Sequence, residues 1–166
     1  MVKLNILCFG NILHGDDGIG AEIARRLLDC ELPENVEVFD VGTQGLNALP
    51  LFSQCSHLLI VDAAELGLSP GEWQFIEPSQ MLSESNADHA GGVGYLLKAA
   101  QAVTHPMPIL TVLGVQKGNI AAFSPHLSNS VMAKLHECIE QIVTLSRDLT
   151  GNTHHSTAQI WGRGKA

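Results

Sequence analysis

Apolar residues in this chain fall into short, nearly continuous runs that alternate with longer runs of helical spacing. The short runs, which indicate strands, cover residues 4–9, 36–41, 58–61 and 109–115, and the nearly all-apolar first and third runs indicate burial on both faces. Helical spacing, in which apolar side chains recur every three or four residues, covers residues 19–28, 46–52, 95–103 and 128–146. This alternation predicts parallel βαβ units with right-handed crossovers.

The remaining patterns complete the predicted architecture. Residues 72–76 indicate an edge strand, and the polar segment 77–88 indicates a long surface loop. The first long helix should bury one face, formed by Ile19, Ile23, Ala24, Leu27 and Leu28. The last helix should do the same with Val131, Leu135, Cys138, Ile139, Ile142 and Val143. We expect an α/β fold, a three-layer α/β/α sandwich around a mostly parallel twisted sheet, with one antiparallel edge strand.

Length and composition indicate one domain. A chain of 166 residues that is 45% hydrophobic can bury one substantial core, but it is short for two ordinary domains. From residue 150 onward the sequence has no hydrophobic period and few apolar residues. We therefore expect a single α/β domain over residues 1–149 and a flexible C-terminal tail over residues 150–166.

Charge and hydropathy narrow the classes of partner. Nine Lys and Arg residues against seventeen Asp and Glu give a formal net charge of -8, which disfavours nucleic acid and anionic membranes. No apolar run approaches the roughly 20 residues that span a bilayer, and the N-terminus lacks a signal-peptide pattern. The cysteines show no C-x-x-C spacing, which predicts reduced and mostly buried thiols at Cys8, Cys30, Cys55 and Cys138. We expect a cytoplasmic protein.

Acidic residues mark the predicted carboxyl ends of two strands, where open α/β sheets bind ligands. Asp16 and Asp17 follow the first strand between Gly15 and Gly18, and Asp62 follows the strand at residues 58–61. Each has an ordinary structural explanation, because an aspartate can cap the following helix or turn. A buried carboxylate such as Asp62 otherwise needs a proton, a cation or hydrogen-bond donors.

A histidine adds a nitrogen donor to this edge. His89 stands just before a glycine-rich helix start, although a lone histidine at a loop end is often structural. Two aspartates and one histidine together would suit Ni, Zn, Fe or Mn with coordination positions left open for a substrate. A nucleotide site, with Asp40 holding a ribose, is the alternative reading of the glycine-rich turn. The glycines do not make G-x-G-x-x-G, and the two acids would repel a pyrophosphate.

Five stretches resemble the hydrogenase maturation endopeptidases, the proteases that trim the C-terminal extension of a [NiFe]-hydrogenase large-subunit precursor. The similarity covers about residues 3 to 145, in order and with similar spacing. Its motifs are GNILHGDDGIG at residues 10–20, DVGT at 40–43, HLLIVDA at 57–63, His89, and LGV at 113–115. The first motif is the most specific.

The resemblance implies an endopeptidase whose metal-binding and catalytic residues correspond to Asp17, Asp62 and His89. It also implies that the metal is the nickel of the substrate, which such enzymes use to recognise a finished active site, with no organic cofactor. The expected partner is the precursor, and one carboxylate would activate water; the resemblance does not decide which. The alternatives are a docking module that binds the precursor without cutting it and a nucleotide-binding α/β domain.

Overall fold

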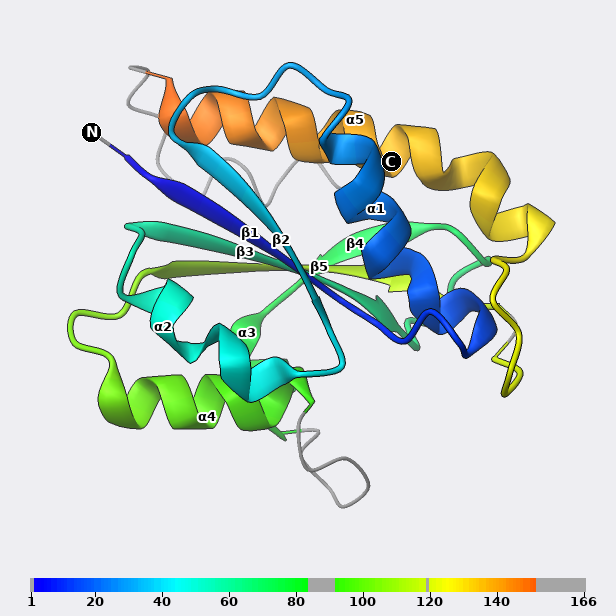
Figure 1. The fold of residues 1–166 in the computed structure, drawn as a ribbon, viewed down its shortest axis with the longest axis horizontal. Helices are drawn as coiled ribbons and strands as arrows, with labels where there is room; N and C mark the ends of the chain where they lie inside the picture. Colours follow the sequence, from blue (N-terminus) through cyan, green and yellow to red (C-terminus); the bar gives the residue numbers. More distant parts are fainter. Residues whose placement is uncertain (1, 84–91, 119, 152–166) are drawn as a thin grey trace.

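Five strands form one twisted sheet in the computed structural model, which describes residues 2–83, 92–118 and 120–151 (Figure 1). The strands are β1 (Leu4–Phe9), β2 (Val36–Gly42), β3 (His57–Ala64), β4 (Trp73–Ile76) and β5 (Ile109–Gln116). Their order is β2-β1-β3-β5-β4, and every neighbouring pair is parallel except β4 with β5. The predicted mostly parallel sheet with an antiparallel edge strand is confirmed.

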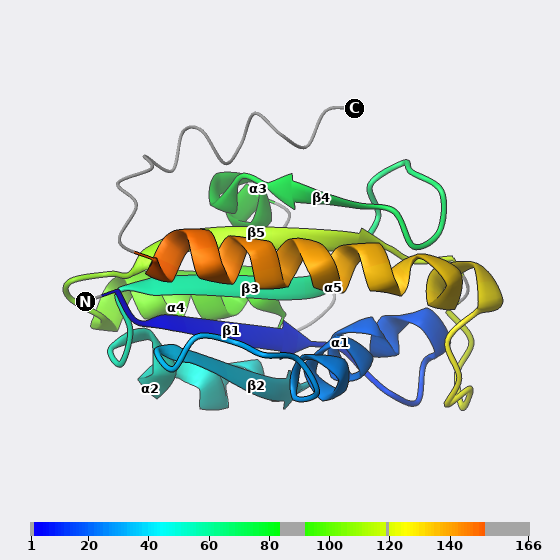
Figure 2. The same cartoon turned by 90° about the horizontal axis from the view of Figure 1, so that it is seen from above.

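Helices cover both faces of the sheet and complete three layers (Figures 1 and 2). One face carries α1 (Ile19–Leu27) and α5 (Asn129–Thr150), and the other carries α2 (Leu49–Phe52), α3 (Pro78–Ser83) and α4 (Val93–Val103). Two short 3-10 helices, η1 (Gly15–Gly18) and η2 (Gly45–Ala48), precede α1 and α2. Successive side chains of β1 point to opposite faces, so Ile6 joins the core under α1 and α5, and Leu7 the core under α4.

A helix occupies part of the segment that we expected to be a surface loop. Residues 78–83 form α3, because Pro78 supplies a preset helical φ at the first position and Gln80 helps to cap the start. The Gln80 Oε1 atom accepts a hydrogen bond of 3.2 Å from the Glu77 N–H, as in a capping box. The prediction of a loop at 77–88 is wrong for these residues, and residues 84–88 lie outside the described part of the chain.

Three further boundaries differ from the predictions. Leu28 was expected on the buried face, but α1 ends at Leu27 and the Leu28 side chain is 75% exposed. Helix α5 continues to Thr150, and Leu149 in this added part packs against the core under α1 and α5. Strand β3 runs to Ala64, so Asp62 lies inside the last part of a strand and not after it.

The C-terminal tail expected from residue 150 lies outside the described residues from 152 onward. The four cysteines all carry free thiols; Cys8 and Cys138 are buried, and Cys30 and Cys55 are half-buried. Within the described ranges, no helix combines the length and the apolar character needed to cross a bilayer.

Candidate active site

The strand order places one crevice at the carboxyl ends of β1 and β3. From β1 the chain crosses through α1 to β2, and then returns through α2, on the opposite face, to β3 on the other side of β1. Such a reversal opens a crevice beyond the strand ends, which is where open α/β sheets bind ligands. Asp17 lies in the turn after β1, that turn contacts β3, and Asp62 lies near the end of β3. The sequence prediction that these acids share one edge is confirmed.

Close backbone packing holds the turn that carries Asp17. Gly10 has a φ of +149°, and a Cβ there would lie 2.1 Å from the Asp17 carbonyl oxygen, so only glycine fits. The Asn11 N–H donates both to that carbonyl, at 3.1 Å, and to the Asp17 Oδ2 atom, at 3.2 Å. The Asp17 side chain is therefore oriented by the backbone of its own turn.

The two adjacent acids have different environments. The Asp16 side chain is fully buried, and its carboxylate accepts hydrogen bonds from the Gly118 N–H at 3.0 Å, the Ser128 N–H at 2.6 Å and the Ser128 hydroxyl at 2.8 Å. These bonds tie the β1–α1 turn to the segment between β5 and α5. Asp17 is only half-buried. Asp16 thus fixes the turn, and Asp17 is the acid presented to the crevice.

Asp62 carries the strongest electrostatic signal of the site. Burial of its carboxyl, together with repulsion from the nearby Asp17, raises the pKa of Asp62 from 3.8 to about 7. The Ala63 N–H and the Lys117 ammonium oppose this shift without cancelling it. The residue as a whole is partly accessible to solvent, although its carboxyl group is largely enclosed by protein. A carboxyl group of this kind can exchange a proton near neutral pH or bind a cation.

The third predicted site residue, His89, lies outside the described residues, which resume at Gly92, the N-cap of α4. Among the residues that are described, no three His, Cys, Asp or Glu side chains are grouped closely enough to hold a metal ion. Asp40 ends up exposed near the end of β2, and its Oδ1 atom accepts a 3.2 Å hydrogen bond from the Gly42 N–H. His14 is exposed.

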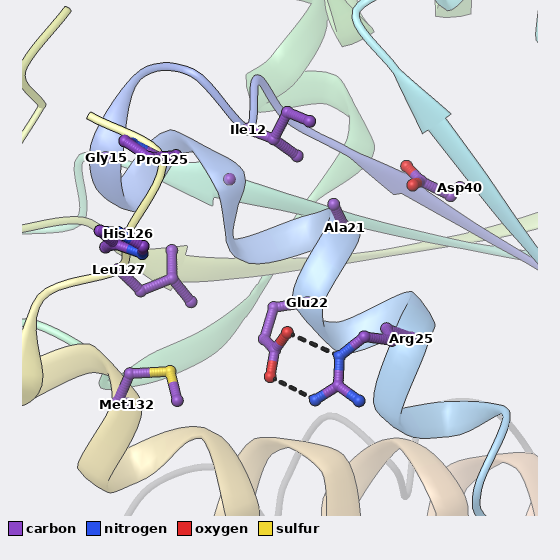
Figure 3. Close-up of a pocket in the computed structure, with 11 residues that line it drawn as sticks. Ile12, Gly15, Ala21, Glu22, Arg25, Asp40, Pro125, His126, Leu127 and Met132 are labelled. Carbon is purple, nitrogen blue, oxygen red and sulfur yellow. Dashed lines mark hydrogen bonds and ion pairs between the residues drawn. The ribbon is translucent and has the colours of Figure 1, made fainter. Parts of the chain in front are cut away.

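A groove of about 550 Å³ adjoins the Asp17 turn on the side of α1 and α5 (Figure 3). Neither Asp17 nor Asp62 lines it, so the groove lies beside the carboxylates and does not contain them. Gly15 and Gly18 border it next to Asp17, and a Glu22–Arg25 ion pair lies along one wall. The arrangement places a concave surface next to the turn that carries Asp17.

Sequence reasoning overlooked two residues that shape this site. Lys117 follows β5 and acts on Asp62 from the neighbouring strand, but no local pattern distinguishes it from a surface lysine. Ser128 caps α5 by accepting a 3.4 Å hydrogen bond from the Val131 N–H, and its hydroxyl also donates to Asp16. A serine three residues before the apolar run is a helix-cap signal that the sequence shows. The hydrogen bond from its hydroxyl to the distant Asp16 has no such signal.

Comparison with known proteins decides the family. The HycI model, described as hydrogenase maturation protease, matches residues 21–145. The chain belongs to this family. The matched range of this protease includes Asp62 and His89, and the Asp17 turn precedes it.

Individual relatives extend the similarity to most of the protease. The hydrogenase expression/formation protein HupD of Rhizobium leguminosarum bv. viciae is 29% identical over 150 residues, which are 87% of this chain and 74% of HupD. The hydrogenase 2 maturation protease of Escherichia coli is 27% identical over 154 residues, covering 89% of this chain and 92% of the relative.

Solved structures agree with this assignment. The hydrogenase maturating endopeptidase HybD from E. coli superposes with a TM-score of 0.75 at 26% identity, over 88% of this chain and 93% of HybD. The [NiFe] hydrogenase maturation protease HycI from Thermococcus kodakarensis gives the same TM-score at 20% identity, over 88% of this chain and 93% of HycI. The latter similarity concerns the fold alone.

Proposed function

We propose that this protease removes the C-terminal extension of a [NiFe]-hydrogenase large-subunit precursor after nickel has been inserted. The carboxyl pair of Asp17 and Asp62 at the β1 and β3 ends carries the proposal. Burial of the Asp62 carboxyl, with repulsion from Asp17 as the second cause, raises the pKa of Asp62 to about 7. A group with a pKa near neutrality both accepts and gives up a proton readily, as peptide hydrolysis requires.

The donor set fits the nickel of the substrate. Carboxylate oxygens from Asp17 and Asp62 and an imidazole nitrogen from His89 are ligands that suit Ni²⁺. Because the nickel arrives already bound to the precursor, the protease needs to supply only part of the coordination shell. A cation would also relieve the repulsion between Asp17 and Asp62, which is the second cause of the raised pKa of Asp62.

Proton balance links nickel recognition to the cut. At neutral pH Asp62 holds its proton part of the time, and a carboxyl group must lose that proton to become a metal ligand. Docking of the nickel-loaded precursor therefore expels a proton and brings the scissile bond to the crevice. One of the two carboxylates then accepts a proton from the attacking water, while the substrate's nickel or a backbone N–H polarises the scissile carbonyl.

Mass spectrometry of the precursor tests the function. The purified protease is incubated with nickel-loaded and with nickel-free precursor. We expect only the nickel-loaded form to lose its extension. Equal cleavage of both forms would remove nickel recognition from the proposal, and an unchanged mass of both would contradict the proteolytic function.

Substitutions test the residues of the proposed site. We expect Asp17→Asn, Asp62→Asn and His89→Ala each to abolish processing while the circular dichroism spectrum stays unchanged. Each removes a ligand or a proton acceptor without altering the core. Asp29→Asn, at an exposed acid just past α1, is the matched control and should retain parental activity. Parental activity in one of the site variants would remove that residue from the site.

A docking module that binds the precursor without cutting it remains the alternative function. It predicts a stable complex between the protease and the nickel-loaded precursor, with both masses unchanged after prolonged incubation. The free thiols of the four cysteines favour a reducing compartment such as the cytoplasm for either activity.

A further inference from the structure

Three large apolar side chains stand out from the surface beside the Asp17 turn. Ile12 is 60% exposed, Leu13 is 51% exposed and Phe123 is 90% exposed; together they are called the apolar rim. Phe123 also has a φ of +59°, which a residue with a bulky side chain rarely adopts. Because so exposed a ring gains little from burial, packing within the fold does not explain why a large apolar side chain occupies this position.

The apolar rim is held rigidly next to Asp17. The Ser124 N–H donates to the Leu13 carbonyl at 3.0 Å, and the Gly15 N–H donates to the Ser124 carbonyl at 2.7 Å. This pair of bonds forms a parallel bridge between the β1–α1 turn and the segment before α5. Phe123 is thus fixed to the turn that presents Asp17, and the rim is organised before any partner binds.

The groove continues the apolar rim toward α1 and α5. Figure 3 shows Ile12 and Ala21 on one side of it and Leu127 and Met132 on the other. Its charged lining includes Asp40 and a Glu22 carboxylate that is already paired with Arg25. Because Arg25 offsets Glu22, Asp40 is the acid in this lining without an opposite charge beside it in the lining, and the apolar walls accept apolar side chains of a partner.

We propose that the apolar rim is the docking surface for the hydrogenase large-subunit precursor, with apolar side chains of the precursor entering the adjoining groove. This inference rests on the proposed function, because it takes that precursor as the substrate. A protease requires a polypeptide at its reactive carboxylates, and the rim is continuous with the turn that carries Asp17. Exposed apolar side chains of this kind mark surfaces for protein partners.

Steady-state kinetics on the nickel-loaded precursor test the rim. Phe123→Asn removes the ring but keeps the backbone, because asparagine tolerates a positive φ. We expect it to raise KM about tenfold, the loss typical of a central aromatic contact, and to leave kcat unchanged. Phe123→Leu keeps an apolar side chain and should stay within about threefold of the parent KM. An unchanged KM in Phe123→Asn would overturn the proposal.

Matched controls lie on other parts of the surface. Leu28 is 75% exposed at the far end of α1, and Val103 is 69% exposed at the end of α4. Leu28→Asn and Val103→Asn should leave KM unchanged; a rise equal to that of Phe123→Asn would overturn the proposal. The proposal would also be overturned if the parent protein were a dimer that Phe123→Asn converts to a monomer without changing KM. The apolar rim would then join two copies of this chain.

Binding measurements separate this inference from the proposed function. The affinity of the Asp62→Asn protein for the nickel-loaded precursor is compared with and without the added Phe123→Asn change. If the parent does not cut but Phe123→Asn still weakens binding about tenfold, the proteolytic function fails and the docking surface stands. If the parent cuts the precursor and the added Phe123→Asn change leaves the affinity unaltered, the docking surface is wrong and the proteolytic function stands.

Discussion

At the scale of single residues, two adjacent aspartates have different surroundings, which predict different effects of substitution. Asp16 is buried and accepts three hydrogen bonds from Gly118 and Ser128. We expect Asp16→Ala to lower the free energy of unfolding by about 3 kcal/mol, since it leaves buried donors without an acceptor. Urea denaturation measures the loss.

Asp17→Ala provides the contrast at the neighbouring position. The half-buried Asp17 carboxylate accepts one backbone hydrogen bond, from the Asn11 N–H. The substitution should therefore lower the free energy of unfolding by only about 1 kcal/mol. Processing of the precursor should nevertheless be abolished. If Asp17→Ala destabilised the protein as much as Asp16→Ala does, the division between a structural and a functional acid would be wrong.

The raised pKa of Asp62 predicts a stability that depends on pH. A carboxyl group whose pKa is 3.8 when unfolded and about 7 when folded binds its proton more tightly in the folded protein. Protonation of Asp62 therefore stabilises the folded protein at acid pH. This contribution to the free energy of unfolding is lost as pH rises from about 4 to about 7. Asp62→Asn removes the penalty and should stabilise the metal-free protein by on the order of 2 kcal/mol at about pH 8.

Thermal unfolding in the presence of a chelator, at about pH 8 and about pH 4, measures this effect. The melting temperature of Asp62→Asn should exceed that of the parent at the higher pH and approach it at the lower one. Glu34→Gln, at an exposed position before β2, is the control and should follow the parent at both values. A variant less stable than the parent at about pH 8 would contradict burial and repulsion as the cause.

At the scale of elements, a glycine sets how closely α1 packs on β1. A Cβ on Gly20 would lie 1.9 Å from the Phe9 carbonyl oxygen, whereas a Cβ on Gly67 would meet nothing within 4 Å. We expect Gly20→Ala to cost about 3 kcal/mol through displacement of the helix. Gly67→Ala should cost only about 1 kcal/mol, because its φ of +70° is strained but its surroundings are open.

Chemical denaturation of the two alanine variants compares them directly. Because α1 begins directly after the Asp17 turn, Gly20→Ala should also reduce processing, and Gly67→Ala should not. Equal losses of stability in the two variants would show that backbone strain, and not the close approach of helix and strand, decides the effect.

At the scale of the whole molecule, two cores share one sheet. Leu135 belongs to the core under α1 and α5, and Leu97 to the core under α4. Since β1 and β3 contribute to both, loss of either layer exposes the same strands. We therefore expect one cooperative transition, in which Leu97→Ala and Leu135→Ala each lower the free energy of unfolding by about 3 kcal/mol.

Differential scanning calorimetry and circular dichroism check this cooperativity. In both variants the free energy of unfolding should depend on urea concentration with the same slope as in the parent. The transitions in the far and near ultraviolet should coincide. A second calorimetric transition in either variant would show that the layers unfold separately, and the expected single domain over residues 1–149 would then be wrong.

Local patterns in the sequence determined most of the elements and the strands that carry the acids. Apolar residues at helical spacing predicted α1, α4 and α5, and continuous apolar runs predicted β1, β3 and β5. Both patterns arise because the buried faces of helices and strands require apolar side chains. Local pattern did not reveal α3, whose start depends on Pro78 and on the side chain of Gln80. Nor did it place Leu28, because one residue past the end of a helix is beyond what periodicity can resolve.

Only the tertiary structure distinguished the surroundings of the two adjacent acids. The sequence placed Asp16, Asp17 and Asp62 at one edge of the sheet, and the resemblance alone favoured Asp17 over Asp16. The partners that distinguish them, Gly118 and Ser128, lie more than a hundred positions away along the chain. Burial and charge coupling depend on distances in space, so the pKa of Asp62 and the exposed ring of Phe123 follow from the fold and from no local pattern.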